Sequence, residues 1–142
     1  MLKFILLFHD CPVDVPRPSH CDLMLESDGS LRTWVLAELP RDWATLLSKL
    51  PARIATQLRF AAGNTVVSER LADHRLAYLD YEGPLSGERG NVTRIDGGTF
   101  EPIEETPDAW EVNLTGEILA GPLSLRRVSE SSAMWHMSVG AR

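Results

Sequence analysis

Apolar and polar residues alternate through the last third of the chain, which is the period expected of strands with one buried face. The apolar positions are Trp110, Val112 and Leu114 in a first run, Leu123 and Leu125 in a second, and Ala133, Trp135, Met137 and Val139 in a third. Gly116 and the Ala120-Gly121-Pro122 group supply turn chemistry between them. The pattern predicts a C-terminal antiparallel meander.

The N-terminal part predicts three further strands, at residues 3–8, 21–26 and 31–38. Residues 27–30 read Ser-Asp-Gly-Ser, a sequence typical of a tight connection. The second and third strands are therefore expected to form a hairpin.

One helical segment is predicted in the middle of the chain, after Asp42 as a possible N-cap. Its apolar residues recur at i, i+3, i+4 and i+7, at Trp43, Leu46, Leu47 and Leu50. Pro51 should end it, and a second short helical stretch could carry Ile54 and Leu58 inward. Gly63 and Asn64 are expected to close this insert.

The remaining segments read as connections. Residues 102–108 are rich in acid and proline and predict a loop. The glycines at positions 83, 87, 90, 97 and 98 lack a P-loop or dinucleotide-binding pattern, so turns are the expected assignment.

Composition favours a single, mainly β domain. The chain has 142 residues, of which 44% are hydrophobic, and its nine prolines and ten glycines are scattered. That spread favours many short elements joined by turns. No internal repeat or linker suggests a second domain, so residues 1–142 are treated as one domain.

A soluble cytoplasmic protein is expected. The apolar run at residues 4–8 is shorter than a signal-peptide core, and no stretch approaches the roughly 20 apolar residues of a membrane span. The two cysteines, Cys11 and Cys21, are too few for a disulfide framework, so reduced thiols are the default.

The formal net charge of −6 weakly opposes a long nucleic-acid footprint. It leaves room for a local basic patch, at Arg89 and Arg94 or at Arg126 and Arg127. Ordinary solvated arginines are the alternative reading of each pair.

A divalent metal site is the main chemical prediction from the residues themselves. His20 and Asp22 lie two apart on a predicted strand, so their side chains should share a face, and His9 ends the first strand. Mixed nitrogen and oxygen ligands suit manganese or zinc. The alternative is a solvated His and Asp. Cys21 should point to the opposite face as a core residue, whereas the pattern gives Cys11 no role.

A second group of titratable residues surrounds His74. Asp73 precedes it, and Asp80, Tyr81 and Glu82 follow before Gly83. The histidine could transfer a proton or hold a phosphate, or be a surface residue oriented by its neighbouring carboxylate. His136 should face outward on the last strand, without a chemical role.

Several ordered motifs resemble the 3′-phosphoesterase module of bacterial DNA ligase D. His9-Asp10 and the segment 20–26, HCDLMLE, are similar to its "HDA…HYDFRLE" element. The segments 72–78, ADHRLAY, and 81–84, YEGP, are similar to its "DHPLDY…FEG" signature. Glycine-rich segments 87–90 and 96–100 follow in the family's order, so the resemblance spans nearly the whole chain.

The resemblance implies a small closed or partly closed β-barrel with flanking helices. It implies that His9, His20 and Asp22 bind manganese or a related ion, such as zinc or cobalt. It places His74 against the phosphate and adds Asp10 to the catalytic candidates. The implied activity is removal of a terminal ribonucleoside and then of the 3′-phosphate from DNA ends during repair. Nucleic-acid 3′ ends and repair proteins are the implied partners.

The chain departs from the family at its phosphate-gripping cations. Met24 replaces an arginine, Val66 stands near the place of another, and the family's lysine has no counterpart near residues 38–40. We hypothesise that Arg17, in a lengthened loop at residues 11–19, takes over part of their role together with Arg75. Two alternatives stay open: a non-catalytic module that binds nucleic-acid ends or a repair partner, and a small-molecule phosphoesterase.

Overall fold

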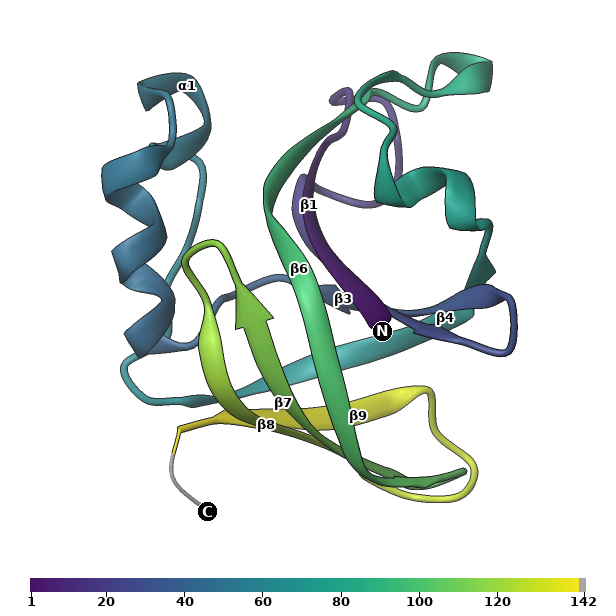
Figure 1. Ribbon diagram of the computed structural model, residues 1–142. Helices are drawn as coiled ribbons and strands as arrows, with labels where there is room; N and C mark the ends of the chain where they lie inside the picture. The colour runs from purple at the N-terminus through teal and green to yellow at the C-terminus, as the bar shows by residue number, and fades with distance from the viewer. Residues whose placement is uncertain (141–142) are drawn as a thin grey trace.

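Eight antiparallel strands close into a barrel in the computed structural model of the chain, which describes residues 1–140 (Figure 1). The ring runs β1-β2-β3-β4-β9-β8-β7-β6 and is closed by pairing of β6 with β1. The strands are β1 Leu2–Asp10, β2 His20–Ser27, β3 Ser30–Leu36, β4 Thr65–His74, β6 Asn91–Thr106, β7 Ala109–Gly116, β8 Ala120–Arg127 and β9 Met134–Val139. The predicted mainly β barrel is confirmed.

Alternation along each strand sorts the side chains between the interior of the barrel and its outer face. On β1, Phe4, Leu6 and Phe8 join the main core, whereas Ile5 and Leu7 belong to a second apolar cluster. Most of the C-terminal meander follows its predicted pattern, because the main core buries Trp110, Val112, Leu114, Leu123, Leu125, Trp135 and Met137. Val139 packs against that core, but Ala133, which precedes β9, is exposed. His136, between Trp135 and Met137, is exposed as expected.

The predicted hairpin joins β2 to β3. Ser27 pairs with Ser30, and the two residues between them have positive φ angles, 50° at Asp28 and 79° at Gly29. Positive φ at both central positions is the geometry of a type I′ turn, whose twist matches that of the strands. The Asp-Gly pair therefore fixes the register that places β2 beside β3.

The central insert closes one end of the barrel. It contains the 3-10 helix η1, Arg41–Lys49, and the short helix α1, Ala52–Ala55. Trp43, Leu46 and Ile54 belong to the same core cluster as the barrel interior, and Leu58 packs against it, as predicted.

Two details of the predicted helix were wrong. The first segment is a 3-10 helix, in which residues three apart share a face, so Trp43 and Leu46 point inward and Leu47 is 38% exposed. Asp42 is not an N-cap: Pro40 precedes the helix, and the backbone N–H of Asp42 donates to the side chain of Asn64.

A second insert covers part of the outer face of β1, β2 and β6. It comprises η2 Leu76–Leu79, the two-residue strand β5 Gly83–Pro84, which pairs with β6, and η3 Ser86–Glu88. Tyr78, Leu79 and Leu85 pack on the apolar outer cluster, which contains Ile5, Leu7, Met24, Leu31 and Val92. This cover creates a sheltered surface outside the barrel.

The loop predicted at residues 102–108 was wrong, because β6 continues to Thr106 and only the tip turns. A register shift between Pro102 and Glu104 accommodates the proline, which cannot donate to a ladder. Turns at Gly97 and Gly98 were also wrong, since both lie within β6. No helix among residues 1–140 is long and apolar enough to cross a membrane.

Gly98 is where β6 and β7 approach too closely for a side chain. A Cβ atom there would lie 2.2 Å from the carbonyl oxygen of Thr115. We expect Gly98→Ala to lower the free energy of unfolding by about 1–3 kcal/mol, because the backbones must separate. Gly63→Ala is the control, since nothing lies within 4 Å of a Cβ there. Equal denaturation midpoints for the two variants would contradict this explanation.

Candidate metal centre and its cavity

His9 and His20 stand directly opposite each other on β1 and β2. Residues opposed across two antiparallel strands place their side chains on the same face. The two histidines are 11 residues apart in the sequence, and strand pairing brings their side chains together. Asp22 follows His20 on that face, as the two-residue spacing predicted. The ring centroids of the two histidines lie 4.9 Å apart.

Backbone carbonyls assign the tautomer of each histidine. Nε2 of His9 lies 2.8 Å from the carbonyl oxygen of Arg89, and Nδ1 of His20 lies 2.8 Å from that of Pro18. A carbonyl oxygen only accepts, so these two nitrogens carry the protons. The other nitrogens face Asp22: His9 Nδ1 is 3.9 Å from Oδ2, and His20 Nε2 is 3.2 Å from Oδ1.

Asp22 is the strongest sign that a cation belongs here. The residue is only 5% exposed, and its buried Oδ1 atom accepts no hydrogen bond from residues 1–140 as long as Nε2 of His20, 3.2 Å away, carries no proton. Buried carboxylates ordinarily have a hydrogen-bond or ion-pair partner. Here the lone pairs of two imidazole nitrogens are turned toward the carboxylate, so the site gathers electron-pair donors and lacks the cation that they would bind. Backbone-held histidines beside a carboxylate are the usual surroundings of a protein-bound metal.

Asp22 also affects the protonation of His20. Burial lowers the pKa of His20, but the carboxylate of Asp22 would accept a hydrogen bond from the protonated ring and attracts its positive charge. These two effects outweigh burial, so the pKa of His20 is raised overall. A proton on His20 and a divalent ion are therefore competing ways to compensate the same buried carboxylate.

Cys11 is the donor that the sequence pattern did not identify. One donor atom each from His9, Cys11 and His20 lie within 4.8 Å of one another, so this group could hold a metal ion. The sulfur is 4.0 Å from Nδ1 of His20. Cys11 follows the last residue of β1, where strand alternation no longer predicts a direction. Cys21 is buried in the main core, as expected, and burial raises the pKa of its thiol.

A cavity of about 150 Å³ opens beside His9, His20 and Asp22. Its lining brings together five of the predicted site residues, His9, Arg17, His20, Asp22 and His74. The other lining residues are Met24, Leu71, Tyr78, Leu85, Arg89 and Val92. Asp10 is not part of the lining; it accepts a hydrogen bond from the hydroxyl of Ser19 in the neighbouring loop.

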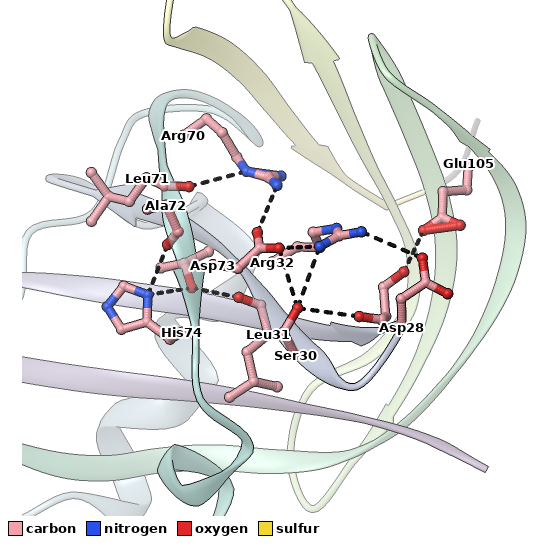
Figure 2. A network of polar contacts seen from close by, with 12 residues as sticks. Asp28, Ser30, Leu31, Arg32, Arg70, Leu71, Ala72, Asp73, His74 and Glu105 are labelled. Atoms are coloured by element: carbon pink, nitrogen blue, oxygen red, sulfur yellow. Dashed lines mark hydrogen bonds and ion pairs between the residues drawn. The ribbon is translucent and has the colours of Figure 1, made fainter.

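His74 ends β4 and is held by backbone and hydroxyl groups. Its Nδ1 lies 3.0 Å from both the carbonyl oxygen of Ala72, as Figure 2 shows, and the hydroxyl of Thr33. These contacts leave Nε2 as the nitrogen available to a ligand, and Tyr78 packs edge-on against the ring. The neighbouring carboxylate of Asp73 instead pairs with Arg32 and Arg70.

Two cations line the cavity, and they differ in their partners. Arg17 donates to both carboxylate oxygens of Glu69, at 3.1 and 3.2 Å, and its hydrogen bond lowers the pKa of Glu69. Arg89 donates only to the carbonyl and hydroxyl oxygens of Ser86 and has no carboxylate partner among the described residues. Its charge therefore remains available to an anion.

The other arginines considered from the sequence do not line the cavity. Arg75 lines a neighbouring hollow with Tyr78 and Arg89. Arg94, Arg126 and Arg127 form ion pairs with Glu117, Glu111 and Asp108 respectively.

No protein-family model matches this chain, and no curated protein matches it in sequence. Its chemistry is therefore inferred from the side chains that the fold brings together. A buried carboxylate, two oriented imidazoles and a thiol lie beside a histidine and an arginine without an ion-pair partner. The cavity is smaller than the roughly 300–1,000 Å³ of typical ligand pockets. It is of a size to admit a phosphoryl group but not a whole nucleotide.

Proposed function

We propose that the protein is a metal-dependent phosphoesterase that acts on 3′ ends of DNA or RNA-tipped DNA in repair. One observation carries the proposal: the buried carboxylate of Asp22 faces one imidazole nitrogen each from His9 and His20. These groups lie beside a cavity that His74 and Arg89 also line. A small site with an open end suits the terminal phosphate of a strand, whose remaining nucleotides would stay outside. The resemblance to the DNA ligase D phosphoesterase module supplies the nucleic-acid substrate.

His9, His20 and Asp22 would hold the ion, with manganese as the first choice and zinc or cobalt as alternatives. When bound, such an ion supplies neutralisation of phosphate charge and a lowered pKa for water. The chain itself orients the substrate. Arg89 and Arg17 grip phosphoryl oxygens, and His74 contacts or protonates a phosphoryl oxygen through Nε2, its Nδ1 being held by Ala72 and Thr33.

Arg89 should contribute more to turnover than Arg17. Arg89→Ala is expected to lower kcat by about 100-fold, within the range for losing a donor to developing transition-state charge. Arg17→Ala should have a smaller effect, because Glu69 already engages its guanidinium. Arg41→Ala is the control, since Arg41 lies on η1 with an exposed side chain.

Unchanged turnover in an Arg17→Ala, Arg75→Ala double variant would exclude the hypothesis that these two replace the family's missing cations.

A non-catalytic module that binds nucleic-acid ends or a repair partner is the second candidate. Pairing of Arg17 with Glu69 favours it, because this pairing reduces the positive charge offered to a phosphate. Hydrolysis of a small phosphorylated metabolite is a further alternative, favoured by the net charge of −6.

A comparison of substrates separates these functions. Phosphate release would be followed from a primer–template with a recessed 3′-phosphate and from a free nucleoside 3′-monophosphate, with manganese present. Preference for the primer–template supports the proposal, and preference for the nucleotide indicates a small-molecule enzyme. Binding of the primer–template without release from either substrate, in metal-loaded protein, indicates the binding module.

The role of Cys11 in metal binding can be read by spectroscopy. If Cys11 joins His9 and His20 around the ion, the cobalt-loaded protein should show thiolate-to-cobalt charge-transfer absorption in the near ultraviolet. Cys11→Ser should remove the band, whereas Cys21→Ser should keep it, because Cys21 faces the core. A soft sulfur ligand would shift preference from manganese toward zinc or cobalt. A cobalt-bound wild type without the band would leave Asp22 as the third ligand and Cys11 outside the shell.

A further inference from the structure

The end of the barrel opposite the central insert holds a much larger cavity. Its volume is about 700 Å³, and it is formed by the β2–β3 turn, the end of β4, the β6–β7 hairpin and the β8–β9 connection. Helices η1 and α1 close the other end with apolar side chains. At this end, by contrast, arginines and tryptophans line the cavity.

Three arginines occupy interior-facing positions, each two residues from a buried interior residue of the same strand. Arg32 lies two residues from Trp34 on β3, Arg70 two from Ser68 on β4, and Arg127 two from Leu125 on β8. Successive side chains of a strand alternate between faces, so all three guanidinium groups enter the mouth of the barrel. All three line the cavity and are partly buried.

The deep part of this mouth has more positive than negative groups. Figure 2 shows Asp73 between the guanidinium groups of Arg32 and Arg70, so one carboxylate serves two cations. Burial lowers the pKa of Arg70, Asp73 only partly offsets this, and the charge of Arg32 lowers it further. Arg127 has its carboxylate partner, Asp108, outside the lining.

The remaining carboxylates lie at the solvent-exposed rim. Asp28, 3.5 Å from Arg32, has a side chain that is 88% exposed, and Glu105 and Glu130 are exposed as well. Exposed carboxylates are screened by water and salt, so they compensate the partly buried guanidinium groups weakly. The mouth therefore combines an acidic rim with an electropositive interior.

Aromatic rings form the wall beneath the arginines. Trp110 and Trp135 line the cavity, and both pack edge-on against Trp34, at centroid distances of 5.7 and 5.6 Å. The guanidinium carbon of Arg70 lies 4.7 Å from the centre of the Trp34 ring. Trp110 and Trp135 are only 5% and 3% exposed, so a flat apolar group entering the mouth would meet the small part of the indole surface that is accessible. An anion attached to that group would meet guanidinium groups.

We propose that this open end of the barrel binds a small organic anion, a phosphate or carboxylate group attached to a flat ring. Arg32 and Arg70 bind the oxyanion from one side and Arg127 from the other, while Trp110 and Trp135 contact the ring. The volume lies within the usual range for small-molecule sites. This site is separate from the metal centre and does not depend on the proposed phosphoesterase activity.

Indole N–H resonances of the ¹⁵N-labelled wild-type protein test the proposal directly. Titration with phenylphosphonate and with benzoate should shift the signals of Trp34, Trp110 and Trp135. The signal of Trp43, which lies on η1 at the opposite end, should stay in place. Benzylamine, with a similar ring but the opposite charge, should cause no comparable shift. Because the wild-type protein is used, this readout does not depend on the stability of a variant.

Variants then assign the binding groups. Arg70→Gln and Arg32→Gln should each weaken binding of phenylphosphonate by about 10-fold or more, the range expected for loss of a charge-assisted hydrogen bond. Arg41→Gln and His20→Ala should bind as wild type does. Absence of indole shifts with both anions at millimolar concentration, or equal shifts with benzylamine, would overturn the proposal. Loss of binding in His20→Ala would place the anion at the metal centre instead.

Discussion

Replacing His20 with alanine is expected to weaken binding of a divalent ion by more than about 100-fold, since loss of residues that merely orient metal ligands already costs up to that factor. His20 directs Nε2 toward Asp22 because its other nitrogen is held by the carbonyl oxygen of Pro18. Calorimetric titration with manganese and zinc measures the change.

Two further variants make this expectation specific. His136→Ala removes an exposed histidine on β9 and should leave the affinity unchanged. Asp22→Asn should lose metal binding. At a pH where His20 is neutral, the metal-free variant should be as stable as wild type or more so, because a buried carboxylate without a compensating charge is removed. Metal binding that survives in both His20→Ala and Asp22→Asn would place the ion elsewhere.

Trp34→Ala is expected to produce the largest loss of stability, about 3–5 kcal/mol in the free energy of unfolding. Trp34 is 0% exposed and lies at the centre of the three-tryptophan cluster, so its removal leaves a cavity that the closed barrel cannot collapse to fill. Chemical denaturation followed by circular dichroism measures the change.

Two control variants separate the effect of losing the aromatic ring from the effect of losing the indole N–H. Trp34→Phe should be milder, because it keeps a ring and removes an indole N–H that has no hydrogen-bond partner among residues 1–140. Val67→Ala, on the exposed face of β4, should change stability by less than about 0.5 kcal/mol. A Trp34→Ala variant as stable as Val67→Ala would show that the tryptophan cluster does not organise the core.

The parts of the fold that depend on alternation could be predicted from the sequence. Strand positions, the Asp-Gly hairpin turn and the opposite faces of Cys21 and Asp22 all follow from the two-residue period of a strand. The meeting of His9 and Asp22 with His20 needed only that the first two predicted strands pair. The phosphoesterase resemblance placed His74 near them, and it does line the same cavity.

The failures came where tertiary structure overrides local preference. Residues 102–106 look like a loop because of acid and proline, yet pairing with β7 extends the strand through them. Cys11 and Arg89 reach the candidate metal centre from connections outside the ring of barrel strands, and no local period specifies the direction of side chains in such connections. Arg32 belongs to no sequence motif; the two-residue period places it on the face of Trp34, and only closure of the barrel makes that face the interior.

The central claim is that His9, His20 and Asp22 form a metal centre that hydrolyses a 3′-phosphate. The most direct test is manganese-dependent release of phosphate from a primer–template with a recessed 3′-phosphate, with wild-type and His20→Ala proteins compared at equal folded concentration. The account predicts release by the wild type that stops when the metal is chelated and is lost in the variant. No release by metal-loaded wild type with manganese, zinc or cobalt, or equal release by His20→Ala, would contradict it.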